Sequence, residues 1–204
     1  MKREYKQNRD KILNSEFSAE HWIKWNLRYI KTYKQIIGNK FKSKILDLGC
    51  GQDYFSKTCQ KYGYHAEGID IEKSDFEKDK LPYKNETFNV IHFNAVIEHI
   101  KNPDNIMKEI KRILKPKGIV IINTPNWALD FKNFYNDPSH QKPYTTEGLK
   151  TLMRMYGFKV IFLEPALICK PRFYWKLPEK IKWKVSSLIK GGSKSILCIG
   201  EKQS

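Results

Sequence analysis

Two carboxylates and a glycine-rich turn stand at a spacing that suits the binding of a nucleoside. Asp47, Gly49 and Gly51 belong to the stretch DLGCG, and Asp70 follows Gly51 by 19 residues. Glycines let a ligand approach the backbone closely, and a carboxylate about 20 residues further on can accept hydrogen bonds from both hydroxyls of a ribose. The pattern alone predicts a nucleotide-like ligand and leaves its identity open.

Two of the five histidines are candidates for proton transfer. His99 lies just past an apolar run at 88–93, and His140 lies in a loop after a second run at 118–123. An imidazole near a reacting hydroxyl is a natural general base. We therefore expect His140 and His99 to act in catalysis or in acceptor contact. The remaining three are assigned structural or surface roles: His21, His65 and His92.

Alternating strands and helices must position these residues. Apolar runs predict strands at 44–48, 65–71, 88–93, 118–123, 158–163 and 195–201. Apolar residues at helical spacing predict helices at 55–62, 103–115 and 145–156. This order is typical of a doubly wound, Rossmann-like α/β sheet, whose ligands bind beyond the carboxyl ends of the strands.

The charge of the chain is concentrated at its flanks. The net charge is +16 over 204 residues, and the segments 1–43 and 165–194 contribute +7 each. We expect one domain spanning 1–204, in which 44–164 and 195–204 form the core and 165–194 is an inserted basic lid. Residues 1–43 should form a helical cap with one aromatic stripe, made of Trp22, Trp25, Tyr29, Tyr33 and Ile36.

Composition narrows the class of protein. With 40% hydrophobic residues and no apolar run long enough for a membrane span, a soluble globular protein is expected. The charged beginning of the chain indicates no secretory signal, and the four cysteines form no Cys-x-x-Cys pair, so a cytoplasmic protein with reduced thiols is predicted. The basic flanks suit an anionic substrate, a nucleic acid or a membrane surface, or merely reflect a lysine-rich composition.

Several motifs occur together in the order ILDLGCG (45–51), GID (68–70), LPYKNETFNVI (81–91), VIEHI (96–100) and ILKPKGIVIINTPN (113–126). In this combination, the stretch 45–126 resembles the class I S-adenosylmethionine-dependent methyltransferases. The later DPSHQKPYTTEGL, followed by YGF, resembles the members that act on small molecules, glycans or lipids. The resemblance implies a seven-stranded sheet, mostly parallel, with an antiparallel last strand.

The resemblance also implies S-adenosylmethionine as cofactor and a set of residues that hold it. The glycine turn would hold its methionine part and ribose, Asp70 the ribose diol, and Asp75 with Phe76 the adenine. The implied cofactor-binding residues are Asp47, Gly49, Cys50, Gly51, Asp70, Ile71, Asp75, Phe76 and Asn94. For the acceptor, Tyr144 and Trp22 are the expected contacts.

The chain departs from the family pattern in two places. Only 17 residues separate Asp70 from Phe88, so the usual helix and third strand of that region must be shortened. Asp53 stands where the family commonly has a third glycine; an Asp tolerates a left-handed backbone and can also cap the following helix.

Glu98 and His99 resemble a pair in the ubiquinone-biosynthesis O-methyltransferases, which are thought to use a further Glu, three residues before that pair, for a divalent metal. Here that position is Ala95. Because two ligands remain, the sequence predicts no metal.

These observations favour S-adenosylmethionine-dependent O-methylation of a small-molecule, sugar or lipid-linked acceptor, with an anionic acceptor suiting the basic flanks. An RNA methyltransferase and a non-catalytic cofactor-binding subunit stay open as alternatives. An NAD-dependent oxidoreductase is disfavoured, because Tyr54 replaces the last glycine of that fingerprint. DNA adenine methylation is disfavoured as well, because the sequence at 94–97 is NAVI in place of an Asn/Asp-Pro-Pro-Tyr motif.

Overall fold

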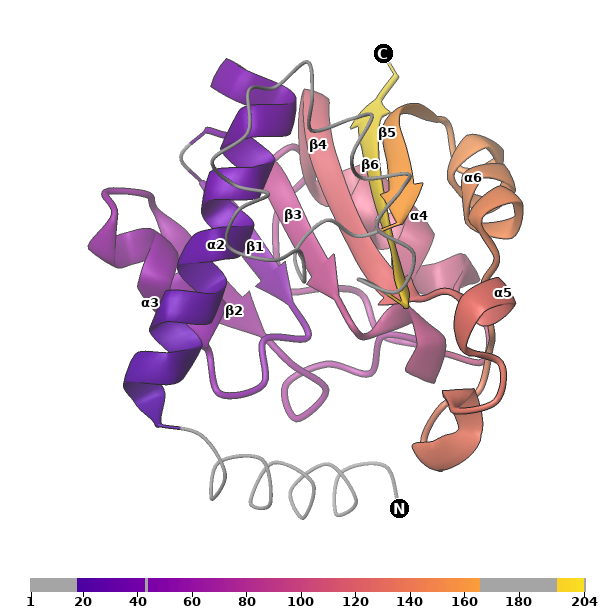
Figure 1. Cartoon of the computed structure of the whole chain (residues 1–204). Coiled ribbons are helices and arrows are strands. Elements are labelled where there is room, and N and C mark those ends of the chain that lie inside the picture. Colours follow the sequence, from indigo (N-terminus) through magenta and orange to yellow (C-terminus); the bar gives the residue numbers. More distant parts are fainter. Residues whose placement is uncertain (1–17, 43, 166–193, 204) are drawn as a thin grey trace.

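The computed structural model describes residues 18–42, 44–165 and 194–203, which build one twisted sheet with helices on both faces (Figure 1). The strands are β1 (Ile45–Leu48), β2 (Ala66–Ile69), β3 (Phe88–Asn94), β4 (Leu114–Pro125), β5 (Phe158–Pro165) and β6 (Ser195–Lys202). Within the described residues their order in the sheet is β2-β1-β3-β4-β6-β5.

Strand directions confirm the predicted α/β architecture and its antiparallel last strand. β1 pairs in parallel with β2 and β3, and β3 pairs in parallel with β4. β6 is antiparallel to both β4 and β5. The expected seventh strand is wrong for the described chain, which forms six, because residues 71–87 fold into turns between β2 and β3 and are too few for both a helix and a strand.

Helices cover the two faces of the sheet. They are α2 (Ala19–Ile37), α3 (Tyr54–Lys61), α4 (Asp104–Ile113), α5 (Trp127–Asp130) and α6 (Thr146–Met155), with the short helices η1 (Gly38–Lys40), η2 (Ile97–His99) and η3 (Phe134–Asn136). One apolar cluster joins α2 and α3 to the sheet, and another joins α4 and α6 to it. Figure 1 shows α2 lying across the strands in front of the sheet.

The aromatic stripe of α2 packs onto the sheet as predicted. Tyr29 and Tyr33 are buried, and Trp25 and Ile36 are partly buried against the same cluster. Each buried apolar side chain of this size contributes about 1.5–3 kcal/mol. Ser18 caps the helix by accepting a hydrogen bond from the backbone N–H of His21.

Much of both basic flanks lies outside the described residues. This applies to residues 1–17 of the predicted cap and to 166–193 of the predicted lid. In the part of the chain that is described, no helix is both long enough and apolar enough to cross a membrane.

Candidate functional site

The glycine turn after β1 has the backbone conformation that its glycines allow. Gly49 has φ 82° and Gly51 φ 53°, both in the left-handed region. The N–H of Gly49 donates to the carbonyl of Ile69 at 2.7 Å, which holds the turn against the end of β2. A Cβ on Gly49 would overlap the side chain of Val96, so residue 49 has to be glycine for two reasons.

Asp53 adopts the predicted left-handed conformation, with φ 63° and ψ 26°. Asp53 is also the N-cap residue of α3, but its carboxylate makes no capping bond to the helix backbone and instead accepts the hydroxyl of Ser56. A Cβ on Gly68 of β2 would overlap Asp53 and Cys50. The third glycine of the turn is therefore replaced by an Asp, while a glycine on the neighbouring strand provides the room.

Asp70 joins the end of β2 to the glycine turn. Its Oδ2 accepts the N–H of Gly51 at 2.5 Å, and its Oδ1 accepts the N–H of Ile71 at 2.6 Å. The residue is buried at 7% exposure. These backbone bonds orient the carboxylate of Asp70, which offers about four acceptor positions, at the edge of the glycine turn.

Asp47 lies in β1, before the turn, and it is buried. Its Oδ1 is 2.7 Å from Nδ1 of His92 in β3, and Nε2 of His92 is 3.2 Å from the hydroxyl of Tyr33 in α2. Hydrogen bonds thus connect Asp47 of β1, His92 of β3 and Tyr33 of α2 in one chain. Its predicted contact with the cofactor stays a prediction.

Asp75 and Phe76 lie in the short connection between β2 and β3. The carboxylate of Asp75 accepts the N–H of Glu77 at 2.9 Å. Phe76 is buried in the core, and its carbonyl accepts the amide of Asn105 at 3.1 Å. A local bond therefore holds Asp75, whereas burial and a bond from α4 hold Phe76.

A carboxylate and a guanidinium from α4 hold the rest of this connection. Glu109 accepts the N–H of Leu81 at 2.7 Å, and Arg112 donates to the carbonyls of Tyr83 at 2.7 Å and Leu81 at 3.1 Å. The hydrogen bond from Arg112 holds the pKa of Glu109 below its ordinary value. Side chains of α4 thus satisfy backbone groups that a third strand would otherwise pair.

The ends of β3 and β4 are tied together by an amide pair. Nδ2 of Asn123 donates to Oδ1 of Asn94 at 2.8 Å, and the N–H of Ala95 donates to the carbonyl of Asn123 at 2.8 Å. Ala95 has φ 53°, which turns the chain into η2. Val96 then packs over Gly49, so the segment carrying Glu98 and His99 begins against the glycine turn.

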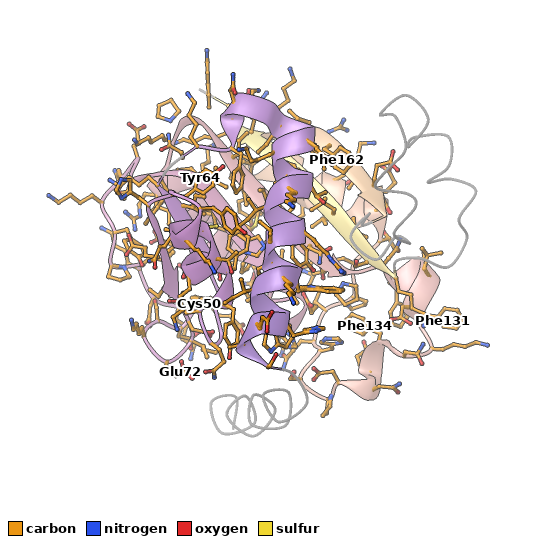
Figure 2. All side chains as sticks on the ribbon, turned by 60° about the vertical axis from the view of Figure 1, so that its left-hand side comes forward. Cys50, Tyr64, Glu72, Phe131, Phe134 and Phe162 are labelled. Atoms are coloured by element: carbon orange, nitrogen blue, oxygen red, sulfur yellow. The ribbon has the colours of Figure 1, made fainter. Side chains whose placement is uncertain are left out.

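Both predicted histidines meet at this edge. The ligand atoms of Glu98, His99 and His140 all lie within 4.8 Å of one another. The carbonyl of Glu98 accepts the N–H groups of Gln141 at 2.8 Å and Lys142 at 3.1 Å, which fastens the loop of His140 onto η2. The glycine turn and this loop both follow carboxyl ends of strands, and Figure 2 shows Cys50 and Phe134 in the lower half of the molecule.

Hydrogen bonds fix the protonated nitrogen of each imidazole. Nδ1 of His140 is 2.6 Å from the carbonyl of Phe134, which can only accept, so Nδ1 carries the proton. The hydroxyl of Ser139 donates to Asp137 at 2.6 Å and therefore accepts from Nδ1 of His99 at 2.9 Å. In the neutral form of both rings, Nε2 carries the lone pair.

The two predicted acceptor contacts lie at different places. Tyr144 is buried, and among the described residues its hydroxyl has no hydrogen-bond partner. Burial and the nearby carboxylate of Glu98 raise the pKa of Tyr144 well above its ordinary value, so it stays a phenol. Trp22 of α2 stacks on Tyr54, the first residue of α3, at 6.0 Å between ring centroids. Trp22 thus lies beside the glycine turn and Tyr144 beside Glu98.

Sequence reasoning missed the partners of these residues. It assigned His92 to the structural or surface class without its link to Asp47, and it did not single out Ser139, which orients His99. A signal was available for Ser139, because it immediately precedes His140 in the motif DPSH. The partnership of Tyr33 with His92 spans 59 residues and left no local pattern.

A family model described as a methyltransferase domain matches residues 5–163. The chain belongs to the class I S-adenosylmethionine-dependent methyltransferases. The family and the cofactor predicted from the sequence are thereby confirmed. The roles of individual residues toward that cofactor stay predictions.

Relatives and solved structures agree with this membership. The chain is 28% identical over 141 residues to a ubiquinone biosynthesis O-methyltransferase of Actinobacillus pleuropneumoniae, a match that covers 57% of this chain and 59% of that protein. The chain thus spans about three fifths of the curated relative. An S-adenosylmethionine-dependent methyltransferase from Archaeoglobus fulgidus superposes with a TM-score of 0.65 at 20% identity, over 94% of this chain and 98% of the other.

A further structural match is the phosphoethanolamine N-methyltransferase 2 of Haemonchus contortus in complex with S-adenosyl-L-methionine. Its TM-score is 0.59 at 18% identity, and the match covers 88% of this chain and 53% of that protein. These structural likenesses concern the fold, and the acceptor of this methyltransferase has to be argued from its own site.

Proposed function

We propose that this methyltransferase transfers the methyl group of S-adenosylmethionine to an oxygen atom of a small-molecule acceptor. The observation that carries the proposal is the packing of Val96 over Gly49, because it sets η2, with Glu98 and His99, directly against the glycine turn. A base for the acceptor and a seat for the cofactor then share one edge of the sheet.

The cofactor half of the proposal is supported by Asp70. Its carboxylate is buried and oriented by the backbone of Gly51 and Ile71, and a ribose hydroxyl would add a charge-assisted hydrogen bond. Such bonds contribute about 1.5–3 kcal/mol each. The left-handed glycines leave the turn without side chains at the points where the cofactor would approach.

The acceptor half is supported by the two imidazoles. A hydroxyl has to lose its proton as its oxygen attacks the methyl carbon, and a neutral ring with its lone pair on Nε2 can accept that proton. In both His99 and His140, Nδ1 donates a hydrogen bond to a neighbouring protein oxygen. Nε2 is therefore the atom that would accept the proton of the substrate hydroxyl. Alignment of acceptor, methyl carbon and sulfur would supply much of the rate.

A small-molecule acceptor is favoured by the ubiquinone biosynthesis O-methyltransferases among the relatives. A sugar, a lipid-linked acceptor or an anionic one stays a prediction that rests on the basic flanks. RNA methylation would use the same flanks, and the acceptor screen below separates these classes.

Calorimetric titration with S-adenosylhomocysteine, the demethylated cofactor, tests the first half. Asp70→Asn should weaken binding about 10-fold to 100-fold, because a neutral amide replaces the charged acceptor. Asp104→Asn is the matched control, since Asp104 opens α4 and pairs with Lys108 and Tyr156. Equal affinity of wild type and Asp70→Asn would contradict the assignment of Asp70, and absence of binding to wild type would contradict the proposal as a whole.

Transfer of a labelled methyl group onto fractionated cell extract tests the second half. Product in a small-molecule fraction is expected, and His140→Ala should lower turnover while cofactor affinity stays within about twofold. Product confined to RNA would replace the proposed acceptor class. Cofactor binding without transfer to any fraction would favour a non-catalytic subunit.

A further inference from the structure

The cluster of Glu98, His99 and His140 combines two imidazoles and a carboxylate. Their ligand atoms lie within 4.8 Å of one another, and Glu98 is almost fully buried. His99 and Glu98 belong to η2, whereas His140 comes from a loop more than forty residues later, so the fold itself assembles the group. A set of three such ligands is found in catalytic zinc sites and in non-haem iron sites.

Outer partners orient these side chains in the way that metal ligands require. Metal-bound histidines almost always donate the other ring N–H to a carboxylate, a carbonyl or a similar group. His140 does so to the carbonyl of Phe134, and His99 does so to Ser139, whose hydroxyl donates on to Asp137. The hydroxyl of Thr124 donates to Oε2 of Glu98 at 2.9 Å. Each member of the cluster therefore has an orienting partner.

Local charge favours a cation at this place. Glu98 contributes a buried carboxylate, and Oδ2 of Asp137 lies 4.0 Å from Nε2 of His140. Atoms that share a zinc ion at about 2.0–2.2 Å lie roughly 3–4 Å apart. Movements of about 1 Å would therefore bring the ligand atoms of Glu98, His99 and His140 to this spacing.

We propose that Glu98, His99 and His140 form a binding site for one divalent transition-metal ion of the zinc, iron or cobalt kind. Two imidazoles disfavour magnesium and calcium, which prefer oxygen ligands. The expectation of no metal counted only Glu98 and His99 and looked for a third ligand at Ala95, whereas the fold supplies His140. Three protein ligands leave an ion of this kind at least one coordination position for a further ligand.

The role of the ion rests on the proposed function, but its binding does not. When bound, such an ion supplies Lewis-acid chemistry that lowers the pKa of a hydroxyl. His99 and His140 would then hold the ion through Nε2, and the proton that the acceptor hydroxyl loses would pass to water.

The test is metal titration of tag-free, chelator-treated protein. Zn²⁺ binding is followed by calorimetry, and Co²⁺ binding by the visible absorption of cobalt in a protein site. Wild type should bind one equivalent. His140→Ala should raise the Kd more than about 100-fold, and Ser139→Ala, which keeps all three ligands, by about 10-fold to 100-fold, as is typical for loss of an outer partner.

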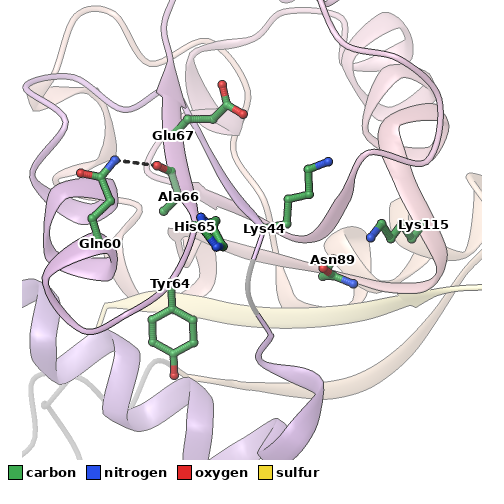
Figure 3. Close-up of a pocket in the computed structure, with 8 residues that line it drawn as sticks. All are labelled: Lys44, Gln60, Tyr64, His65, Ala66, Glu67, Asn89 and Lys115. Atoms are coloured by element: carbon green, nitrogen blue, oxygen red, sulfur yellow. Dashed lines mark hydrogen bonds between the residues drawn. The ribbon is translucent and has the colours of Figure 1, made fainter.

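His65→Ala is the matched control for histidine at a surface. His65 is exposed and precedes β2, in a surface pocket with Lys44, Asn89 and Lys115 at the amino ends of the strands (Figure 3). The glycine turn follows the carboxyl end of β1, so this edge is opposite it, and in Figure 2 the neighbouring Tyr64 lies above Cys50. His65→Ala should bind metal as wild type does.

The outcomes separate this inference from the proposed function. S-adenosylhomocysteine affinity, measured on every variant, reports the fold and the cofactor half independently of the metal. Wild type that binds S-adenosylhomocysteine but neither Zn²⁺ nor Co²⁺ would overturn the metal site and leave the methyltransferase proposal standing. Equal metal affinity in wild type, His140→Ala and Ser139→Ala would likewise overturn it.

Discussion

Nδ1 of His92 lies 2.7 Å from Oδ1 of Asp47, and both side chains are buried. Because a carboxylate only accepts, Nδ1 donates to it, and Nε2 accepts from the hydroxyl of Tyr33 at 3.2 Å. Burial raises the pKa of Tyr33 well above its ordinary value, so the phenol keeps the proton it donates. The ring of Phe55 stacks on His92 at 3.7 Å between centroids and closes the other side.

Substitutions of His92 and Tyr33 should lower the free energy of unfolding by different amounts. His92→Leu leaves a buried carboxylate without its donor and should cost about 3–5 kcal/mol, whereas Tyr33→Phe removes one hydrogen bond and should cost about 1 kcal/mol. His92→Asn can still place an amide N–H near Asp47 and should fall between them. Urea unfolding checks this order. Equal stability of His92→Leu and Tyr33→Phe would show that the buried side chain of Asp47 does not depend on its hydrogen bond to His92.

Gly49 should tolerate alanine far less well than Gly63 does. Both glycines have φ 82°, but a Cβ on Gly49 would overlap Val96, whereas a Cβ on Gly63 would have no atom within 4 Å. Gly63→Ala should therefore cost only the backbone strain of about 1–2 kcal/mol. Gly49→Ala should cost clearly more and should also weaken cofactor binding, because the strained turn is the proposed cofactor seat.

A second substitution isolates the steric part of this effect. Val96→Ala in the Gly49→Ala background should recover the excess over Gly63→Ala, because it removes the overlapping methyl groups. Thermal unfolding resolves the difference, since about 1 kcal/mol shifts the melting temperature by about 2–4 °C in a chain of this size. Equal losses in the two single variants would show that Val96 moves aside at no cost.

Features that depend on residues close together in the sequence could be predicted, whereas contacts between distant residues could not. The glycine turn, the succession of strands and helices along the chain and the left-handed Asp53 could be predicted, because each depends on residues close together in the sequence. The seventh strand was wrong because it was expected from the family, although the 17 residues after Asp70 are too few to form it.

Interactions between distant residues were the part that the sequence could not supply. His99 and His140 were each expected at the site, but their meeting with Glu98 depends on the loop bonded to the carbonyl of Glu98. The prediction of no metal counted only ligands close together in the sequence, and it therefore missed His140. The link from Asp47 to Tyr33 similarly needs three elements packed in register.

Tyr144→Phe should separate stability from acceptor binding. Among the described residues the hydroxyl of Tyr144 is buried without a hydrogen-bond partner, which costs about 1–3 kcal/mol. Its removal should leave the free energy of unfolding unchanged or higher. If the hydroxyl contacts the acceptor, the KM for the acceptor should rise several-fold while cofactor affinity is unchanged. An unaltered KM would remove Tyr144 from the acceptor site.

Glu109 should make stability depend on pH through its bond to Arg112. That hydrogen bond holds the pKa of Glu109 below its ordinary value of 4.5, against the raising effect of burial. A carboxyl whose pKa is lower in the folded state stabilises the fold above the unfolded pKa and loses this contribution as pH falls through the folded pKa. The contribution is therefore complete at pH 7 and disappears in the range below about pH 4.5.

Glu109→Gln exposes this contribution, because glutamine keeps the shape and loses the charge. At pH 7 it should be less stable than wild type by about 1.5–3 kcal/mol, since the side chain holds Arg112 and the backbone of Leu81. Urea unfolding at pH 7, 5, 4 and 3.5 should show the two proteins converging, as other carboxyls titrate equally in both. Glu147→Gln is the control, because its pair with Lys150 is exposed and should show no such convergence. A constant gap between Glu109→Gln and wild type down to pH 3.5 would show that Glu109 acts through its shape alone.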